Sequence, residues 1–166
     1  MAGYDIGDQV VYPPHGAGTV EAKETRDDAF GEYLSIRIAH SKMTLMVPAA
    51  TAADKGVRPV VSAKAADALL KGLMGDSEEL AESPQLRARQ AADTTRAGDA
   101  TGLANALRDY MGRQRNGAKL SAVEKKAIET MKLILSSEIA MAKGMELSEA
   151  AAKLDKALEA AAAVPE

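Results

Sequence analysis

The hydrophobic pattern of the chain changes its period near residue 62. Before that point apolar and polar side chains alternate, as in Leu34, Ile36 and Ile38, which is the period of a half-buried strand. After it, apolar residues recur every three or four positions, which is the period of an amphipathic helix. The 166 residues are enough for two small domains. We therefore predict an α+β protein, in which a small β-barrel of about five strands over residues 1–62 precedes an all-α helical bundle over residues 63–166.

The predicted barrel is organised around the stretch from Gly7 to Glu21. There the β-branched run Val10–Tyr12 is stopped by a proline pair and turned back through Gly16 and Gly18, which is typical of two strands joined by a tight turn. Further strands are expected at three places: residues 32–38, 43–47 and 59–61.

One of these strands carries an apolar side chain on its outward face. Met43, Leu45 and Val47 alternate onto one face, so Met46 is expected on the other face, beside Thr44. Two explanations are open. Met46 belongs to a second small cluster covered by the linker, or it is an exposed contact for a partner.

Capping signals divide the second half into helices. Five predicted helices start at side chains that accept hydrogen bonds from first-turn N–H groups: Ser62, Ser83, Asp99, Ser121 and Ser148. The strongest signal is the capping box Ser121–Glu124, from which a long central helix, with Val123 and Ile128 on its apolar face, is expected to end at Gly144. Residues 160–166 are expected to form a frayed tail.

The charge is distributed unevenly along the chain. The net charge is −3, yet residues 84–132 contain ten Lys and Arg against five Asp and Glu. A basic block therefore lies inside an acidic chain. A solvated helical surface explains this block as well as a face that binds phosphate groups does.

No catalytic or metal-binding motif stands out. The chain has no cysteine, so His15 and His40 are the only nitrogen ligands for a zinc site, and we expect no metal and no cofactor. The segment Gly16-Ala17-Gly18 lacks the third glycine of a dinucleotide fingerprint and is interpreted as a turn. His15 has no nucleophile or carboxylate placed with it by a motif, so we expect a protein that is not an enzyme.

The chain also contains short blocks whose residues and spacing are specific. In the first half they are Gly7-Asp8-x-Val10-Val11-Tyr12-Pro13, His15-Gly16-x-Gly18-x-Val20-Glu21, Met43-Thr44-Leu45-Met46-Val47-Pro48 and Gly56-Val57-Arg58. In the second half they are Leu107-Arg108-Asp109-Tyr110, Leu120-Ser121-x-x-Glu124-Lys125 and Glu138-Ile139-Ala140-Met141-Ala142-Lys143. Over nearly the whole chain they resemble the CarD/CdnL family of bacterial transcription factors.

This resemblance implies a fold and two partners. The β-part would be a Tudor-like (SH3-like) barrel that binds the β subunit of RNA polymerase. The helical part would hold promoter DNA near the upstream edge of the transcription bubble and so stabilise the open complex. By position, the implied polymerase-binding residues are Arg26, Met46 and Pro48. The implied residues of the basic face that meets DNA are Arg87, Arg89, Lys125 and Lys126.

The sequence departs from the family at one position. Many members carry a tryptophan wedge for the DNA minor groove, whereas this chain has no tryptophan and Pro84 stands in that place. Pro84 and Leu86 are candidates to replace it, since both residue types act as wedges, but proline is equally explained as an ordinary first helical residue. Without a wedge, DNA contact would rest on phosphate neutralisation, so we expect it to be weak and largely non-specific.

Two rival functions belong to other classes. The chain could be an adaptor that docks on RNA polymerase, or on a helicase relative, without touching DNA, or an enzyme that uses His15. No apolar stretch approaches the length of a membrane span, and the first residues lack the features of a signal peptide. We expect a monomer in the bacterial cytoplasm, associated with the nucleoid through polymerase.

Overall fold

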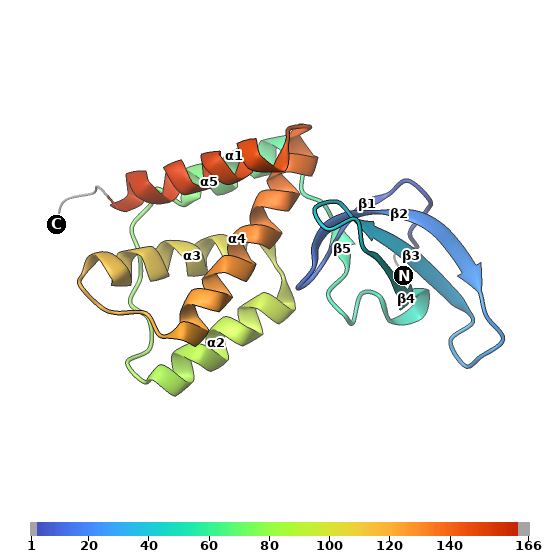
Figure 1. Cartoon of the computed structure of the whole chain (residues 1–166), viewed down its shortest axis with the longest axis horizontal. Helices are drawn as coiled ribbons and strands as arrows, with labels where there is room; N and C mark the ends of the chain where they lie inside the picture. The colour runs from blue at the N-terminus through green and yellow to red at the C-terminus, as the bar shows by residue number, and fades with distance from the viewer. Residues whose placement is uncertain (1–2, 163–166) are drawn as a thin grey trace.

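In the computed structural model, which describes residues 3–162, a β-sheet is followed by a bundle of helices (Figure 1). The strands are β1 (Gln9–Tyr12), β2 (Gly16–Thr25), β3 (Glu32–Ile38), β4 (Thr44–Pro48) and β5 (Arg58–Pro59), with a 3₁₀ turn η1 (Ala49–Thr51) after β4. The helices are α1 (Ala63–Gly72), α2 (Pro84–Ala97), α3 (Ala100–Arg115), α4 (Ala122–Lys143) and α5 (Leu147–Ala162). This arrangement confirms the predicted α+β class.

The five strands pair in an antiparallel sheet with the order β4-β3-β2-β1-β5. The strand ends differ from the prediction: β1 begins at Gln9, β2 continues to Thr25, β4 is Thr44–Pro48 instead of residues 43–47, and β5 is Arg58–Pro59 instead of residues 59–61. A bulge between Val20 and Ala22 shifts the register of β2 against β3. The inward face is apolar and buried, and its residues include Val10, Val20, Leu34, Ile36, Ile38 and Val47. The predicted alternation of Leu34, Ile36 and Ile38 is therefore confirmed.

Most predicted helix starts are confirmed by their capping bonds. The side chains of Ser62, Ser83, Asp99 and Ser121 each accept a backbone N–H of the first turn. At α4 the capping box is complete, because Glu124 N–H donates to Ser121 Oγ at 3.1 Å and Ser121 N–H donates to Glu124 Oε2 at 2.8 Å. Gly98 and Gly144 end α2 and α4 in the left-handed conformation.

Four expectations were wrong. Met43 precedes β4 and is 50% exposed, so it does not share the buried face of Val47. Val123 is 61% exposed, because it lies in the first turn of α4, outside the apolar face. Helix α5 begins at Leu147, so Ser148 is inside the helix rather than its cap. Residues 160–162 continue α5 instead of fraying, and residues 163–166 lie outside the described residues.

Helix α4 connects the two parts of the molecule. It crosses the bundle, and its second half reaches the sheet at β1 and β2 (Figure 1). Strand β1 has two apolar faces, since Val10 points into the sheet core while Val11, together with Ala17 of β2, belongs to the core of the helices. The sheet therefore contributes side chains to the helical core, and the two parts share a packed interface.

Candidate interaction surfaces

The first candidate surface is the outward face of β3 and β4, with Arg26 at its edge. The register places Tyr33 opposite Pro48 and Ser35 opposite Met46, so these four residues share one face of the sheet. The Arg26 guanidinium carbon lies 4.7 Å from the centre of the Tyr33 ring. We call Arg26, Tyr33, Met46 and Pro48 the outward sheet face. The three residues that the family resemblance implies as polymerase contacts thus lie on one face, together with Tyr33, which the sequence analysis missed.

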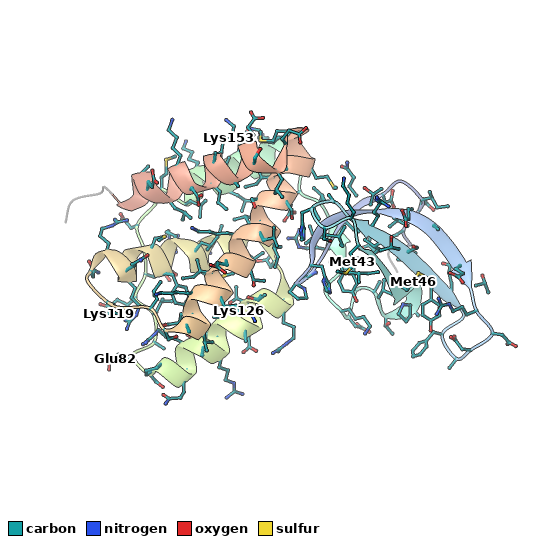
Figure 2. The ribbon with its side chains drawn as sticks, in the orientation of Figure 1. Met43, Met46, Glu82, Lys119, Lys126 and Lys153 are labelled. Atoms are coloured by element: carbon teal, nitrogen blue, oxygen red, sulfur yellow. The ribbon has the colours of Figure 1, made fainter. Side chains whose placement is uncertain are left out.

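Met46 is half-buried on this face rather than fully exposed. Its neighbour Ser35 is almost completely buried although it points away from the core. Met46 is therefore directed outward, as predicted, but it is also packed against the sheet. Figure 2 shows Met46 on the sheet, in the part of the molecule away from the helices.

The loop beside this face is fixed by Asp28. Its carboxylate accepts hydrogen bonds from the backbone N–H groups of Phe30 and Gly31, at 2.9 and 3.1 Å, and from the Tyr33 hydroxyl at 2.9 Å. The Phe30 N–H, with the other two donors, lowers the pKa of Asp28, and the same hydrogen bond to Asp28 raises the pKa of Tyr33. The ring that stacks with Arg26 is therefore held in place at neutral pH.

The second candidate surface lies over the first two turns of α2 and of α4. Pro84, Leu86 and Arg89 are exposed on α2, with Leu86 at 44%, and Lys125 and Lys126 are exposed on α4. Pro84 occupies the first helical position, where its missing N–H has no consequence. Val123, also exposed, lies one turn before Lys126 and lines the same hollow, and it is an apolar side chain that the sequence pattern assigned to the core. We call Leu86, Arg89, Val123, Lys125 and Lys126 the helix-end face.

Arg87 is not part of this surface. The residue is only 5% exposed, and its Nε donates to Glu124 Oε1 at 2.7 Å. Its Nη1 donates to the carbonyl oxygens of Ala81 and Glu82 at 2.9 and 2.7 Å. The expectation that Arg87 faces DNA is therefore wrong. Three of its five N–H donors are used within the protein and its side chain is only 6% exposed, so the guanidinium is not presented to a phosphate in solvent.

The Arg87–Glu124 pair instead positions the surface. It joins the first turns of two neighbouring helices, so that Arg89 and Lys125 are held on adjacent helix ends. Burial raises the pKa of Glu124, but the hydrogen bonds from Ser121 and Arg87 outweigh burial and the net pKa lies below its ordinary value. The carboxylate is thus kept charged at neutral pH.

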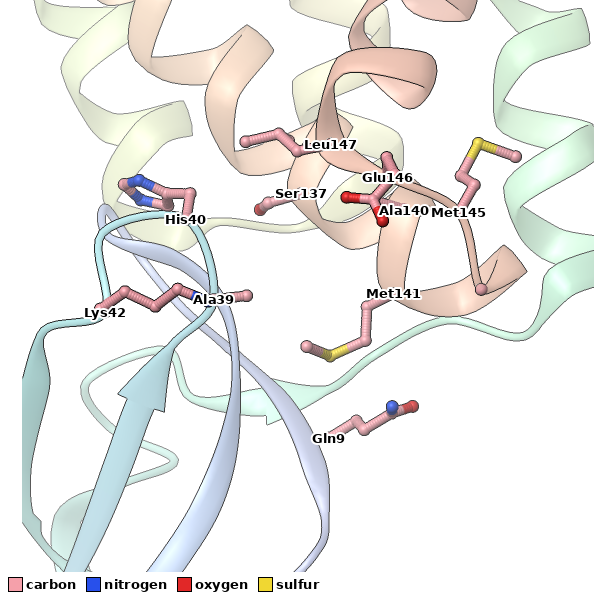
Figure 3. Close-up of a pocket in the computed structure, with 11 residues that line it drawn as sticks. Gln9, Ala39, His40, Lys42, Ser137, Ala140, Met141, Met145, Glu146 and Leu147 are labelled. Carbon is pink, nitrogen blue, oxygen red and sulfur yellow. The ribbon is translucent and has the colours of Figure 1, made fainter.

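A cleft of about 390 Å³ separates the sheet from the end of α4 (Figure 3). It is lined by Gln9, His40 and Lys42 from the sheet side and by Ser137, Met141 and Met145 from the helix side, among others. His40 Nε2 donates to the carbonyl of His15 at 2.7 Å, and the His15 ring lies edge-on to Tyr12. Both histidines therefore have structural contacts, and the Ser137 hydroxyl in the same cleft accepts from the Ala17 N–H and donates to the Ile134 carbonyl.

Within the described residues, no group of three or more His, Cys, Asp or Glu side chains is arranged to hold a metal ion. None of the helices described is long and apolar enough to cross a membrane. The two candidate surfaces lie in different parts of the molecule, with Met46 on the sheet and Lys126 on the helices (Figure 2).

Comparisons with known proteins cover both parts of the chain. A family model described as CarD-like/TRCF RID domain matches residues 4–61, and one described as CarD, C-terminal domain matches residues 68–155. A protein of Bacillus subtilis (strain 168) named "Putative transcription factor YdeB" is 34% identical over 149 residues, which cover 86% of this chain and 94% of that protein.

Proposed function

We propose that this chain, which belongs to the CarD family of transcription factors, binds RNA polymerase through its sheet and promoter DNA through its helices, and so stabilises the open complex. Members of this family are transcription factors and not enzymes. The sheet belongs to a family of RNA polymerase-interacting domains. The finer proposal names the β subunit as the partner and the upstream edge of the bubble as the DNA site.

The observation that carries the proposal is the outward sheet face. Arg26 stacks on Tyr33 there, and Met46 and Pro48 lie on the adjacent strand, so a cation and apolar groups share one solvent-facing patch. Arginine, aromatic and methionine side chains are enriched at protein interfaces. This patch faces away from the sheet core and is available to a second protein.

The helix-end face supports contact with DNA. Arg89, Lys125 and Lys126 are exposed cations, and Leu86 and Val123 are exposed apolar groups in the first turns of the same two helices. Cations of this kind neutralise phosphates without reading sequence, and their contribution falls steeply with salt. We propose that the contact between the sheet and polymerase supplies most of the affinity for the promoter complex. By holding the chain on polymerase, this contact raises the local concentration of the helix-end face at the promoter.

The open-complex lifetime tests the proposal. With the cognate polymerase and a dye placed in the bubble, the wild-type chain is expected to lengthen this lifetime. Met46→Glu is expected to abolish the gain, because a charge would be placed in the middle of an interface. Met43→Glu, which changes an exposed methionine outside β4, is the matched control and is expected to keep it. If the wild-type chain left the open-complex lifetime unchanged, the proposal would be contradicted.

The adaptor alternative is separated by charge reversal on the helices. Arg89→Glu with Lys126→Glu is expected to shorten the lifetime while binding to polymerase persists, and to lower the salt slope of DNA binding by about one unit for each phosphate that is no longer neutralised. Lys153→Glu, on α5 away from Lys126 (Figure 2), is the control. An unchanged lifetime in the double variant would favour an adaptor that does not touch DNA.

The missing wedge gives a third variant. Pro84 is exposed at the start of α2, so Pro84→Trp introduces a large ring at the helix end without disturbing the core. If the exposed Leu86 and Pro84 act as a weak wedge, the tryptophan is expected to lengthen the open-complex lifetime further. A shorter lifetime in Pro84→Trp would argue against insertion at this position.

A further inference from the structure

Two consecutive residues of α4 hold the sheet. Ser137 Oγ accepts a hydrogen bond from the backbone N–H of Ala17 at 2.9 Å. The neighbouring Glu138 is 0% exposed, and its Oε2 accepts from the backbone N–H of Val61 at 2.9 Å. A buried carboxylate needs further compensation, since its desolvation is costly.

Arg58 of β5 supplies that compensation and reaches a third element. Its two terminal nitrogens donate to the two oxygens of Glu138 at 2.6 and 2.7 Å, a bidentate pair. Its Nε and Nη2 also donate to the carbonyl oxygen of Gly98, at 2.9 and 2.7 Å. One guanidinium therefore joins the edge of the sheet, the second half of α4 and the end of α2.

The surrounding contacts leave little room for movement. A Cβ added to Gly98 would lie 2.0 Å from Cγ of Pro13, and one added to Gly16 would lie 2.9 Å from Ser137 Oγ. Backbone of the helical part thus touches the β1–β2 turn directly, and backbone of the sheet touches α4. A rotation between the two parts would drive these atoms into one another or break the hydrogen bonds of Arg58.

We infer that Arg58 is a positioning residue, which fixes the helix-end face relative to the outward sheet face. The inference rests on the proposed function. A buried ion pair is by itself weak evidence for stability, and its best-attested use is to specify one arrangement. Here the pair lies between the parts that would bind the two partners, so it sets where DNA is held once polymerase is bound.

The length of α2 makes this position sensitive. The helix has 14 residues, so Pro84 lies about 20 Å from the end that Arg58 holds. A tilt of about 10° at Gly98 would move the helix start by about 3–4 Å, a displacement that breaks hydrogen bonds to phosphate oxygens. A loosened joint would thus weaken DNA contact without altering any residue that touches DNA.

The variant that tests the inference is Arg58→Met with Glu138→Gln. The pair of changes removes the guanidinium and the buried charge together, while the introduced amide keeps an oxygen for the Val61 N–H, so the fold is expected to persist. The control is Lys132→Met with Asp155→Asn, which removes an ion pair within the helical part. Circular dichroism and the unfolding midpoint establish that both variants are folded.

The first readout is the distance between the two parts. Because the chain has no cysteine, Glu32→Cys and Lys119→Cys give two unique, exposed sites for spin labels, one on the sheet and one after α3. The wild-type chain and the control are expected to give one narrow distance distribution. The Arg58 variant is expected to give a broad one. A narrow, unshifted distribution in that variant would overturn the inference.

The second readout is function, which a merely structural pair would not move selectively. Affinity for the polymerase β subunit is expected to stay within the range of the control, whereas the gain in open-complex lifetime is expected to fall by roughly an order of magnitude. An unchanged gain would also overturn the inference. Failure of the proposed function would be visible in the wild-type arm alone, and the distance distribution would then decide the inference by itself.

Discussion

Helix α4 carries two buried glutamates that meet arginines in different surroundings. Glu124 is 2% exposed, lies in the first turn and pairs with Arg87 of α2. Glu138 is fully buried in the second half of the helix and pairs with Arg58 of β5. The first pair joins two helices of the bundle, and the second joins the bundle to the sheet.

The difference lies in what each carboxylate receives from its own helix. Glu124 closes a capping box with Ser121 and lies at the positive end of the helix dipole, so α4 alone stabilises part of its charge. Glu138 lies far from the helix start, and its hydrogen bonds come from Arg58 and the Val61 N–H. The charge of Glu138 is therefore tolerated only when the sheet is docked, whereas that of Glu124 belongs to the bundle.

The largest expected effect comes from breaking the Glu138 pair. Arg58→Ala leaves a buried carboxylate with one backbone donor, and we expect it to lower the free energy of unfolding by about 4–5 kcal/mol. Urea denaturation measures the loss. Arg108→Ala, which removes a partner of the adjacent Asp109 within α3, is the control and is expected to cost much less. Equal losses of unfolding free energy in the two variants would mean that the Glu138 carboxylate does not depend on Arg58 of the sheet.

Arg87→Ala is expected to cost less, about 3 kcal/mol, because Glu124 keeps the capping box and the helix dipole. The same denaturation measurement checks it, with Arg89→Ala as the control on the same helix. Arg89 is exposed, so its loss is expected to leave stability nearly unchanged. If Arg87→Ala lowered the free energy of unfolding no more than Arg89→Ala does, Arg87 would be an exposed surface residue and not the buried partner of Glu124.

Gly98→Ala tests the contact between the parts without altering any charge. The left-handed conformation of Gly98 costs an alanine about 1 kcal/mol, and the overlap with Pro13 adds about 1–2 kcal/mol. Gly144→Ala is a close control, since its φ of +66° matches the +65° of Gly98 and no described atom lies within 4 Å of its added Cβ. The difference in unfolding free energy between the two variants measures the contact with Pro13. A difference of zero would mean that the β1–β2 turn moves away from the added methyl group at no cost.

The smallest expected effect is a change in the acid limb of stability. The pKa of Glu124 is lowered in the folded state, so its contribution is present above the ordinary value of 4.5 and is lost as the pH falls below it. Glu124→Gln lacks this contribution at every pH, because the amide does not ionise. We therefore expect the stability gap between the wild-type chain and Glu124→Gln to narrow as the pH falls below 4.5, as followed by thermal unfolding. A gap that widens instead would reverse the assigned direction.

Local signals in the sequence are sufficient for the fold class and for most helix starts. Ser83 followed by Pro84, and Ser121 followed by Glu124, act within one turn, so their meaning does not depend on distant residues. The prediction that Ser148 caps a helix is wrong because this local signal is ambiguous. A serine resembles a cap wherever it precedes an apolar run, but here the helix begins one residue earlier, at Leu147.

The candidate surfaces depend more on distant contacts. Arg87 resembles the other cations of the basic block, and nothing near it in the sequence indicates that its partner Glu124 lies 37 positions later. Arg58 belongs to one of the family-specific blocks, but its role needs Glu138, 80 positions away. Met46 is easier to predict, since strand alternation alone directs it outward.

The separation between Arg58 and Glu138 also bears on how the chain is made. A ribosome that adds about 5–20 residues per second needs roughly 4–16 s to pass from one residue to the other. During that interval nearly all of the strand residues have been made, but Val11 and Ala17 lack the part of the helical core that α4 contributes and Arg58 lacks the Glu138 carboxylate. The contacts of Ala17 with Ser137 and of Arg58 with Glu138 therefore form only after most of α4 has left the ribosome, so the docking side of the sheet is the last part of it to be covered.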